Sequence, residues 1–237
     1  MDGSLQDRHV LVIGRGSGIA RAIVEAARAA GARVTAAGRD RAQLAAAYDD
    51  PGITAETVDL TDDSSIEALA GRLQSVDHVV STASARARGL LADLQREQVR
   101  LSFETKVIGP LMLAKHLRPK VNPGGSIVLF SGDFAFKITV GTLGVAITNG
   151  AADTLCRSLA VELAPIRVNA ISPGIIDTGA WDTFPGGKEE FFKHAAATNP
   201  AGRIGRSEDI AGAVLFCMTN TFLTGVTLKV DGGEALI

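Results

Sequence analysis

An apolar run that leads directly into a glycine-rich turn, and then into a helical pattern, limits the possible folds of this chain more than any other feature. His9–Ile13 is a short β-rich run, and Ile19 and Ile23 then recur at helical spacing. A second β-rich run, Arg33–Ala37, follows Gly31. Strand, turn, helix and strand in this order predict a βαβ unit, in which the two strands lie parallel in one sheet.

Strand and helix patterns alternate along the rest of the chain. A helix with a bend near Pro110 is expected over Asp93–Leu117, and another over Thr142–Leu163. Further strands are expected at Ile53–Val58, Asp77–Ser81, Ser126–Phe130, Ile166–Ile171 and Val226–Val230. Repeated βαβ units predict one α/β domain over residues 1–237, with a Rossmann-like, doubly wound parallel sheet of about seven strands.

Composition excludes several classes of protein. Hydrophobic residues make up 46% of the chain, which favours a packed fold over disorder, and the net charge of −2 gives no electrostatic reason to expect nucleic acid or an anionic membrane as a partner. No apolar run has the length of a membrane span, and no signal peptide is evident, so we expect a cytoplasmic protein. Cys156 and Cys217 lie in apolar helical patterns, which indicates buried free thiols, and we expect no metal site.

The glycine-rich turn itself indicates a nucleotide site. Glycine lets the backbone approach a pyrophosphate closely, and the first turn of the following helix offers free N–H groups to the phosphate oxygens. This turn directly joins a strand to a helix, as a dinucleotide site requires. We therefore predict that a dinucleotide cofactor binds at Gly14, Arg15, Gly16, Ser17, Gly18 and Ile19.

Motifs along the whole chain resemble the short-chain dehydrogenase/reductase family. Gly14-x-x-x-Gly18-Ile19-Ala20 is similar to the family's glycine loop, and the stretch from Ser172 to Thr178 is similar to its Pro-Gly-x-x-x-Thr segment. The resemblance implies that Asp59 and Leu60 hold the adenine and that Thr82 and Ala83, in the turn after the fourth strand, also bind the cofactor. It implies that the nicotinamide end is held by Pro173, Gly174, Ile176 and Thr178.

The second strand ends in Gly38 and Arg39, a pair that bears on the choice of cofactor. Enzymes that use NAD commonly place an acidic residue there, whereas users of NADP leave a small residue and a basic neighbour for the 2′-phosphate. The pair therefore favours NADP(H) over NAD(H), with Arg15 as a second cation. The alternative is that Arg39 is only a solvated surface residue.

The family's catalytic Asn, Ser, Tyr and Lys are all replaced at the positions where the resemblance places them. These positions hold Lys106, Gly132, Val145 and Asn149, and Ser131 lies one residue before the position of the serine. Tyr48, the single tyrosine, belongs to an early helix. Loss of a general acid typically lowers the rate by a factor of about 10²–10⁴, although cofactor and substrate can still be brought together.

Three functions are compatible with this replacement. In the first, the chain is an oxidoreductase that reduces a small carbonyl, imine or activated alkene, and Lys106, Ser131, Asp133 and Asn149 form a noncanonical site. In the second, it binds NADP(H) without redox activity, as a sensor or silent subunit. In the third, it is a non-redox isomerase or cyclase. For Lys106 the alternative to an inward catalytic position is that its side chain extends to solvent.

A stretch punctuated by glycine follows Thr178, and the resemblance implies a substrate lid at about residues 179–200. Its aromatic residues Trp181, Phe184 and Phe191 either line an apolar substrate pocket or pack the lid against the core. The resemblance also implies a homotetramer, or a homodimer, assembled through the two long helices and the last strand.

Overall fold

The computed structural model describes residues 4–182 and 187–237. Its main sheet has seven strands in the order β3-β2-β1-β4-β5-β6-β9, and every neighbouring pair is parallel. The strands are β1 (His9–Ile13), β2 (Arg33–Gly38), β3 (Ile53–Thr57), β4 (Val76–Ser81), β5 (Val121–Phe130), β6 (Arg167–Pro173) and β9 (Thr227–Val230). The predicted doubly wound α/β fold is confirmed.

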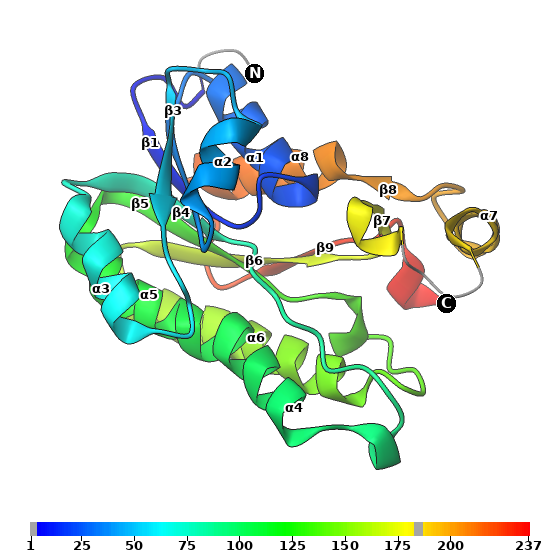
Figure 1. Cartoon of the computed structure of the whole chain (residues 1–237). Coiled ribbons are helices and arrows are strands. Elements are labelled where there is room, and N and C mark those ends of the chain that lie inside the picture. Colours follow the sequence, from blue (N-terminus) through cyan, green and yellow to red (C-terminus); the bar gives the residue numbers. More distant parts are fainter. Residues whose placement is uncertain (1–3, 183–186) are drawn as a thin grey trace.

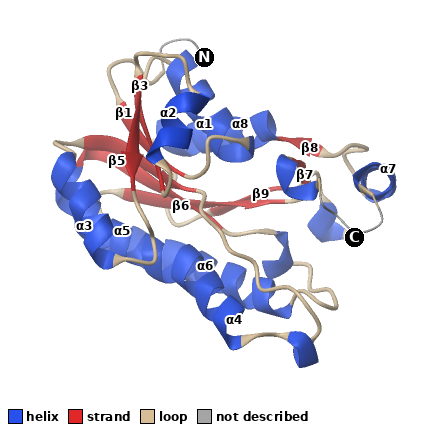
Figure 2. Ribbon diagram, viewed as in Figure 1, coloured by secondary structure: helices blue, strands red, loops and turns tan. Residues whose placement is uncertain are grey.

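Helices cover both faces of this sheet (Figures 1 and 2). One layer contains α1 (Gly18–Ala29), α2 (Arg41–Ala47) and α8 (Ser207–Thr219), and the other contains α3 (Asp63–Arg72), α4 (Arg96–Phe103), α5 (Gly109–Leu117) and α6 (Leu143–Glu162). Short 3₁₀ turns lie at Leu91–Asp93, Arg118–Lys120, Asp133–Ala135, Gly179–Trp181 and Glu234–Leu236. A small parallel pair, β7 (Ile176–Asp177) and β8 (Gly205–Arg206), flanks helix α7 (Lys188–Thr198) at one end.

Two hydrophobic cores follow from the alternation of side chains along each strand. In β1, Val10 and Val12 point into the core shared with α1 and α8, whereas Leu11 and Ile13 point into the core under α3, α5 and α6. Both faces of the sheet are buried, so the strand sequences are continuous apolar runs and do not alternate between apolar and polar residues. The buried free thiols of Cys156 and Cys217 complete these cores, as predicted.

The helix predicted over Asp93–Leu117 is divided by a π-helical turn. Helix α4 ends at Phe103, a π turn spans Glu104–Ile108, and α5 follows with Pro110 in its first turn. Proline lacks an N–H, so the carbonyl four residues before it receives no helical hydrogen bond, and the turn ahead of the proline widens. Lys106 lies in the middle of this turn.

No helix in residues 4–182 and 187–237 is long and apolar enough to cross a membrane.

Candidate active site

The loops that follow β1 and β4 interlock at the carboxyl edge of the sheet. A side chain at Gly14 would place its Cβ 2.3 Å from Thr82 Oγ1. The Thr82 hydroxyl itself donates to the carbonyl of Ile13 at 2.9 Å, which holds the turn after β4 against the end of β1. Ala83, next in this turn, is partly buried against the core under α5. Glycine at position 14 is therefore required by close packing.

The glycine loop also meets the segment that follows β6. Gly18 has φ +56°, and a Cβ built on it would lie 3.4 Å from Thr178 Cβ. Pro173 ends β6, Gly174 packs against Asp231 after β9, and Ile176 is buried in β7. The residues predicted to hold the two ends of a dinucleotide thus lie at one edge of the sheet, where such folds bind their ligands.

The first turn of α1 is free to bind an anion. Ser17 is the N-cap residue of this helix, yet its side chain makes no capping hydrogen bond. Arg15 and Ser17 are exposed, whereas Ile19 packs against the core and Gly16 faces Ala47, whose Cβ would lie 2.7 Å from a Cβ at position 16. Unsatisfied N–H groups at a helix N-terminus bind phosphate oxygens well.

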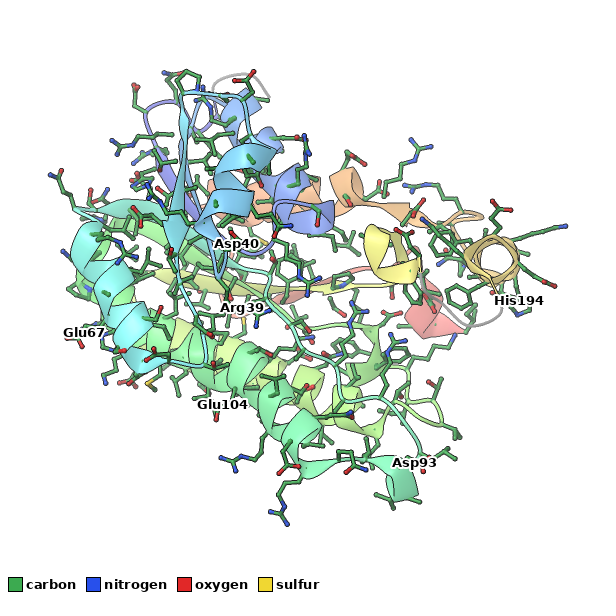
Figure 3. All side chains as sticks on the ribbon, viewed as in Figure 1. Arg39, Asp40, Glu67, Asp93, Glu104 and His194 are labelled. Carbon is green, nitrogen blue, oxygen red and sulfur yellow. The ribbon has the colours of Figure 1, made fainter. Side chains whose placement is uncertain are left out.

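Arg39 lies exposed at the end of β2, next to the glycine loop (Figure 3). Within the described ranges, its guanidinium has no ion-pair partner and donates no side-chain hydrogen bond. A Cβ at Gly38 would lie only 2.7 Å from the Gly14 carbonyl oxygen. A carboxylate is therefore disfavoured at position 38, and Arg39 is the group available to a ligand there.

Asp59 and Leu60 shape the turn after β3. The Asp59 carboxylate accepts from the backbone N–H of Thr61 at 2.9 Å and from its hydroxyl at 2.8 Å. Leu60 is buried, and its carbonyl oxygen would lie 2.5 Å from a Cβ on Gly109 of α5. Both residues therefore have structural contacts at the position where the resemblance implies an adenine site.

Lys106 is buried, and the alternative in which it extends to solvent is wrong. Only 8% of the residue is exposed. Its Nζ donates to the carbonyl of Ser131 at 2.8 Å and to Asn149 Oδ1 on α6. The Ser131 hydroxyl in turn donates to the Asn149 carbonyl at 3.1 Å. Three of the four predicted catalytic residues thus form one hydrogen-bond network that joins the π turn, the end of β5 and α6.

Burial lowers the pKa of Lys106 to about 7, because desolvation disfavours the ammonium. The positive charge of Arg86 lowers this pKa further, whereas the carboxylate of Asp153 opposes the shift. The amine is thus poised to gain or lose a proton near neutral pH, which suits a group that stabilises a developing charge.

Asp133, the fourth predicted catalytic residue, lies in a separate cluster of carboxylates. It begins the 3₁₀ turn after β5 and is buried. Desolvation, together with the charges of Asp231 and Glu234, raises its pKa to about 7. Asp231 and Glu234 were missed from the sequence, since they follow β9, and nothing in the local pattern links them to Asp133.

Comparison with known proteins identifies the family of this chain. Residues 13–234 match the family described as enoyl-(acyl carrier protein) reductase. L-xylulose reductase from Bos taurus is 32% identical over 246 residues, which cover 98% of each protein. The chain belongs to the short-chain dehydrogenase/reductase family. This is a family of oxidoreductases, and solved structures of its members are similar to the structure of this chain.

Two solved structures of the family overlay on this chain over nearly its full length. A small-chain dehydrogenase in complex with NADPH has a TM-score of 0.85 and 29% identity, covering 98% of this chain and 100% of its own. The MalC reductase/Diels-Alderase from Malbranchea aurantiaca has a TM-score of 0.90 and 30% identity, covering 99% of both chains.

Packing accounts for glycine at the position where the family's serine is expected. A Cβ on Gly132 would lie 2.8 Å from Asn149 Nδ2, so the Asn149 amide occupies the space of a serine side chain. Val145, one helical turn before Asn149, is also buried. Tyr48 lies far from these residues, packed against the α1 core, where burial raises its pKa to about 12.

The region predicted as a lid contains a cluster of aromatic rings. Trp181 donates through Nε1 to the Ile176 carbonyl at 2.8 Å, and its ring stacks on Phe191 of α7 with centroids 5.0 Å apart. The Arg88 guanidinium lies 5.7 Å from the Trp181 ring centroid. These contacts tie α7 to β7 and to the loop after β4. Phe184 lies outside the described residues.

Proposed function

We propose that this protein is an NADP(H)-dependent oxidoreductase that reduces a small carbonyl, imine or activated alkene at a site without the family's Tyr-Lys pair. The observation that carries the proposal is the contact between Gly18 and Thr178, with a Cβ position 3.4 Å from the threonine Cβ. This contact places the loop of Gly18, which would bind a pyrophosphate, beside the loop of Thr178, which would bind a nicotinamide. A protein that needed only the adenosine half would have no use for the second loop.

The residues present fit a bound NADPH. The uncapped first turn of α1 and the glycine loop would hold the pyrophosphate, and Arg39 would bind the 2′-phosphate. Thr178, together with the backbone of Pro173, Gly174 and Ile176, would hold the nicotinamide end. The cofactor, when bound, supplies a hydride. The relative solved with NADPH adds support for this cofactor.

Lys106 takes the electrophilic role in this proposal. With a pKa near 7, its amine is charged in part of the molecules at neutral pH and stabilises negative charge that develops on a substrate. Asn149 and the Ser131 carbonyl hold its Nζ in place. Because Val145 replaces the family's proton donor, substrates that need no strong acid are favoured over simple ketones.

Titration with NADPH and NADH, followed by NADPH absorbance over ketones, imines and activated alkenes, tests the proposal. We expect tighter binding of NADPH and its oxidation by at least one class. Tight binding without oxidation would overturn it in favour of a binding protein or a non-redox isomerase or cyclase. The similarity to a reductase/Diels-Alderase gives the cyclase specific support.

We also propose a homotetramer or homodimer assembled through the layer of α4, α5 and α6. Large apolar side chains remain exposed in this layer of the isolated chain. The exposed fractions are 48% for Leu101 on α4, 41% for Ile108 in the π turn and 47% for Ile147 on α6. Apolar side chains that gather on one helical layer mark an interaction surface.

A further inference from the structure

Three carboxylates from distant parts of the chain meet at the carboxyl edge of the sheet. Asp133 follows β5, whereas Asp231 and Glu234 follow β9, and β6 lies between these two strands. The carboxyl groups of Glu234 and Asp231 lie close enough to Asp133 to help raise its pKa. We call Asp133, Asp231 and Glu234 the carboxylate cluster.

The two outer carboxylates accept hydrogen bonds from backbone N–H groups. Asp231 accepts from Gly233 at 2.9 Å and from Ala235 at 3.2 Å, and Glu234 accepts from Ile175 at 3.4 Å. These backbone contacts fix the positions of the two carboxyl groups beside Asp133.

Asp133 is left with an unsatisfied buried oxygen. Only 7% of Asp133 is exposed, and its Oδ1 has no hydrogen-bond partner among the described residues. A buried acceptor without a partner is unfavourable, and a bound donor would offset this cost. Ser172 Oγ, near the end of the intervening strand β6, is a second buried atom without a partner in this part of the chain. The unpartnered oxygen of Asp133 points to a missing donor.

The protein's own cations do not neutralise the cluster. Lys229 on β9 lies with its Nζ 4.0 Å from the centroid of the Phe136 ring, and Lys137 lies one turn after Asp133. Within residues 4–182 and 187–237, no ion pair joins a lysine or arginine to a member of the carboxylate cluster. Asp231 and Glu234 are only half-buried, so the cluster is open on their side.

The cluster adjoins the site of the proposed reaction. Asp133 lies two residues after Ser131, whose carbonyl holds Lys106, and Glu234 bonds to the backbone of Ile175, next to the predicted nicotinamide segment. We propose that the carboxylate cluster binds a positively charged nitrogen of the substrate, so that the substrate class is a protonated imine or an iminium ion. This inference rests on the proposed reductase function.

The chemistry of such a substrate fits a site without tyrosine. When the carbon of a C=N⁺ group accepts a hydride, a C–H bond forms and the π electrons become the nitrogen lone pair. The product is a neutral amine, which takes its proton from water. No alkoxide forms, so no side chain has to donate a proton during the step. The carboxylates would hold the cation, and reduction would remove the charge that they recognise.

An inorganic cation is the competing occupant. No group of three or more His, Cys, Asp or Glu side chains in the described residues is arranged to hold a metal ion. The organic cation is therefore the occupant that the geometry favours.

Calorimetric binding of pyrrolidinium and of cyclopentanol, a neutral molecule of similar shape, tests the inference on the full chain with NADP⁺. We expect pyrrolidinium to bind about tenfold more tightly than cyclopentanol at pH 8. Asp133→Asn and Glu234→Gln should each remove most of this preference. Glu67→Gln, on the outer side of α3 (Figure 3), should leave it unchanged. Equal binding of the two probes, or displacement of pyrrolidinium by an equal concentration of Mg²⁺, would overturn the inference.

Kinetics with NADPH then separate the two proposals. Reduction of 1-pyrroline in preference to cyclopentanone, lost in Asp133→Asn, supports both. Reduction of ketones without selective binding of pyrrolidinium overturns the cation site alone. Binding of pyrrolidinium that depends on Asp133, with no oxidation of NADPH by any substrate, overturns the reductase and leaves the cation site.

Discussion

Lys106 Nζ, in the π turn between α4 and α5, donates a hydrogen bond to Asn149 Oδ1 on α6. The same Asn149 amide faces Gly132 through Nδ2, where a Cβ would come within 2.8 Å. The Asn149 side chain therefore links three of the four positions at which the family's catalytic residues are expected. The residues at these positions are coupled by packing and should be tested as a unit.

Lys106→Met should lower turnover by about 10² or more, because it removes the charge that stabilises the transition state. It should leave the affinity for NADPH within a few-fold. Single-turnover kinetics and a fluorescence titration measure the two effects, with Lys115→Met on the exposed face of α5 as the matched control. Unchanged turnover would rule out Lys106 as the electrophile.

Arg39→Ala should weaken NADPH binding by about ten- to a hundredfold, the value of a charge-assisted, two-point hydrogen bond to phosphate. Binding of NADH should change little. Isothermal titration with both cofactors measures the difference, and Arg41→Ala, whose guanidinium donates to the Ala55 carbonyl, serves as the control. Equal losses of affinity for NADPH and NADH would show that Arg39 does not bind the 2′-phosphate.

Gly132→Ser should destabilise the protein by about 1–3 kcal/mol, as overpacking of a dense interior does. The new Cβ would meet Asn149 Nδ2 at 2.8 Å, and Asn149 cannot retreat without loss of its bond from Lys106. In an Asn149→Ala background the penalty should shrink. A double-mutant cycle by urea unfolding measures this coupling, and additive effects would contradict it.

Asp133 should make stability fall with pH between about 4 and 7. Its pKa is raised to about 7 in the folded protein and is about 3.9 when unfolded, so the folded state binds this proton more tightly. The contribution is fully present below the unfolded pKa and is lost as pH rises to the folded one. Urea unfolding at pH 5 and pH 8 measures this. The free energy of unfolding of Asp133→Asn, relative to that of wild type, should be higher at pH 8 than at pH 5. Parallel pH profiles would refute the shift.

Ile147→Glu should dissociate the proposed oligomer, because a carboxylate would replace a side chain that is 47% exposed on α6 in the isolated chain. Sedimentation velocity measures the loss of the assembly. Ile138→Glu, on the exposed loop after β5 and outside the helical layer, should leave the assembly intact. Equal sedimentation of wild type and Ile147→Glu would place the interface elsewhere.

Local patterns in the sequence determined the fold of this protein and the edge of the sheet where its glycine-rich loop lies. The periods of strands and helices, and the need for glycine at positions such as Gly14 and Gly18, depend on near neighbours and on backbone geometry, so they can be read without a structure. An irregularity of the helix near Pro110 was also evident locally. The π turn over Glu104–Ile108 was not.

Only the tertiary structure decided that Lys106 is buried with its amine bonded to Asn149, and that Asp133 lies near Asp231 and Glu234. These contacts depend on the strand order, which places the ends of β5 and β9 on either side of β6 although they are far apart in the chain. Spacing in the sequence carries no signal for such pairs. The shifted pKa values of Lys106 and Asp133 arise from desolvation and from charges on other elements, which exist only once the sheet and its helices have assembled.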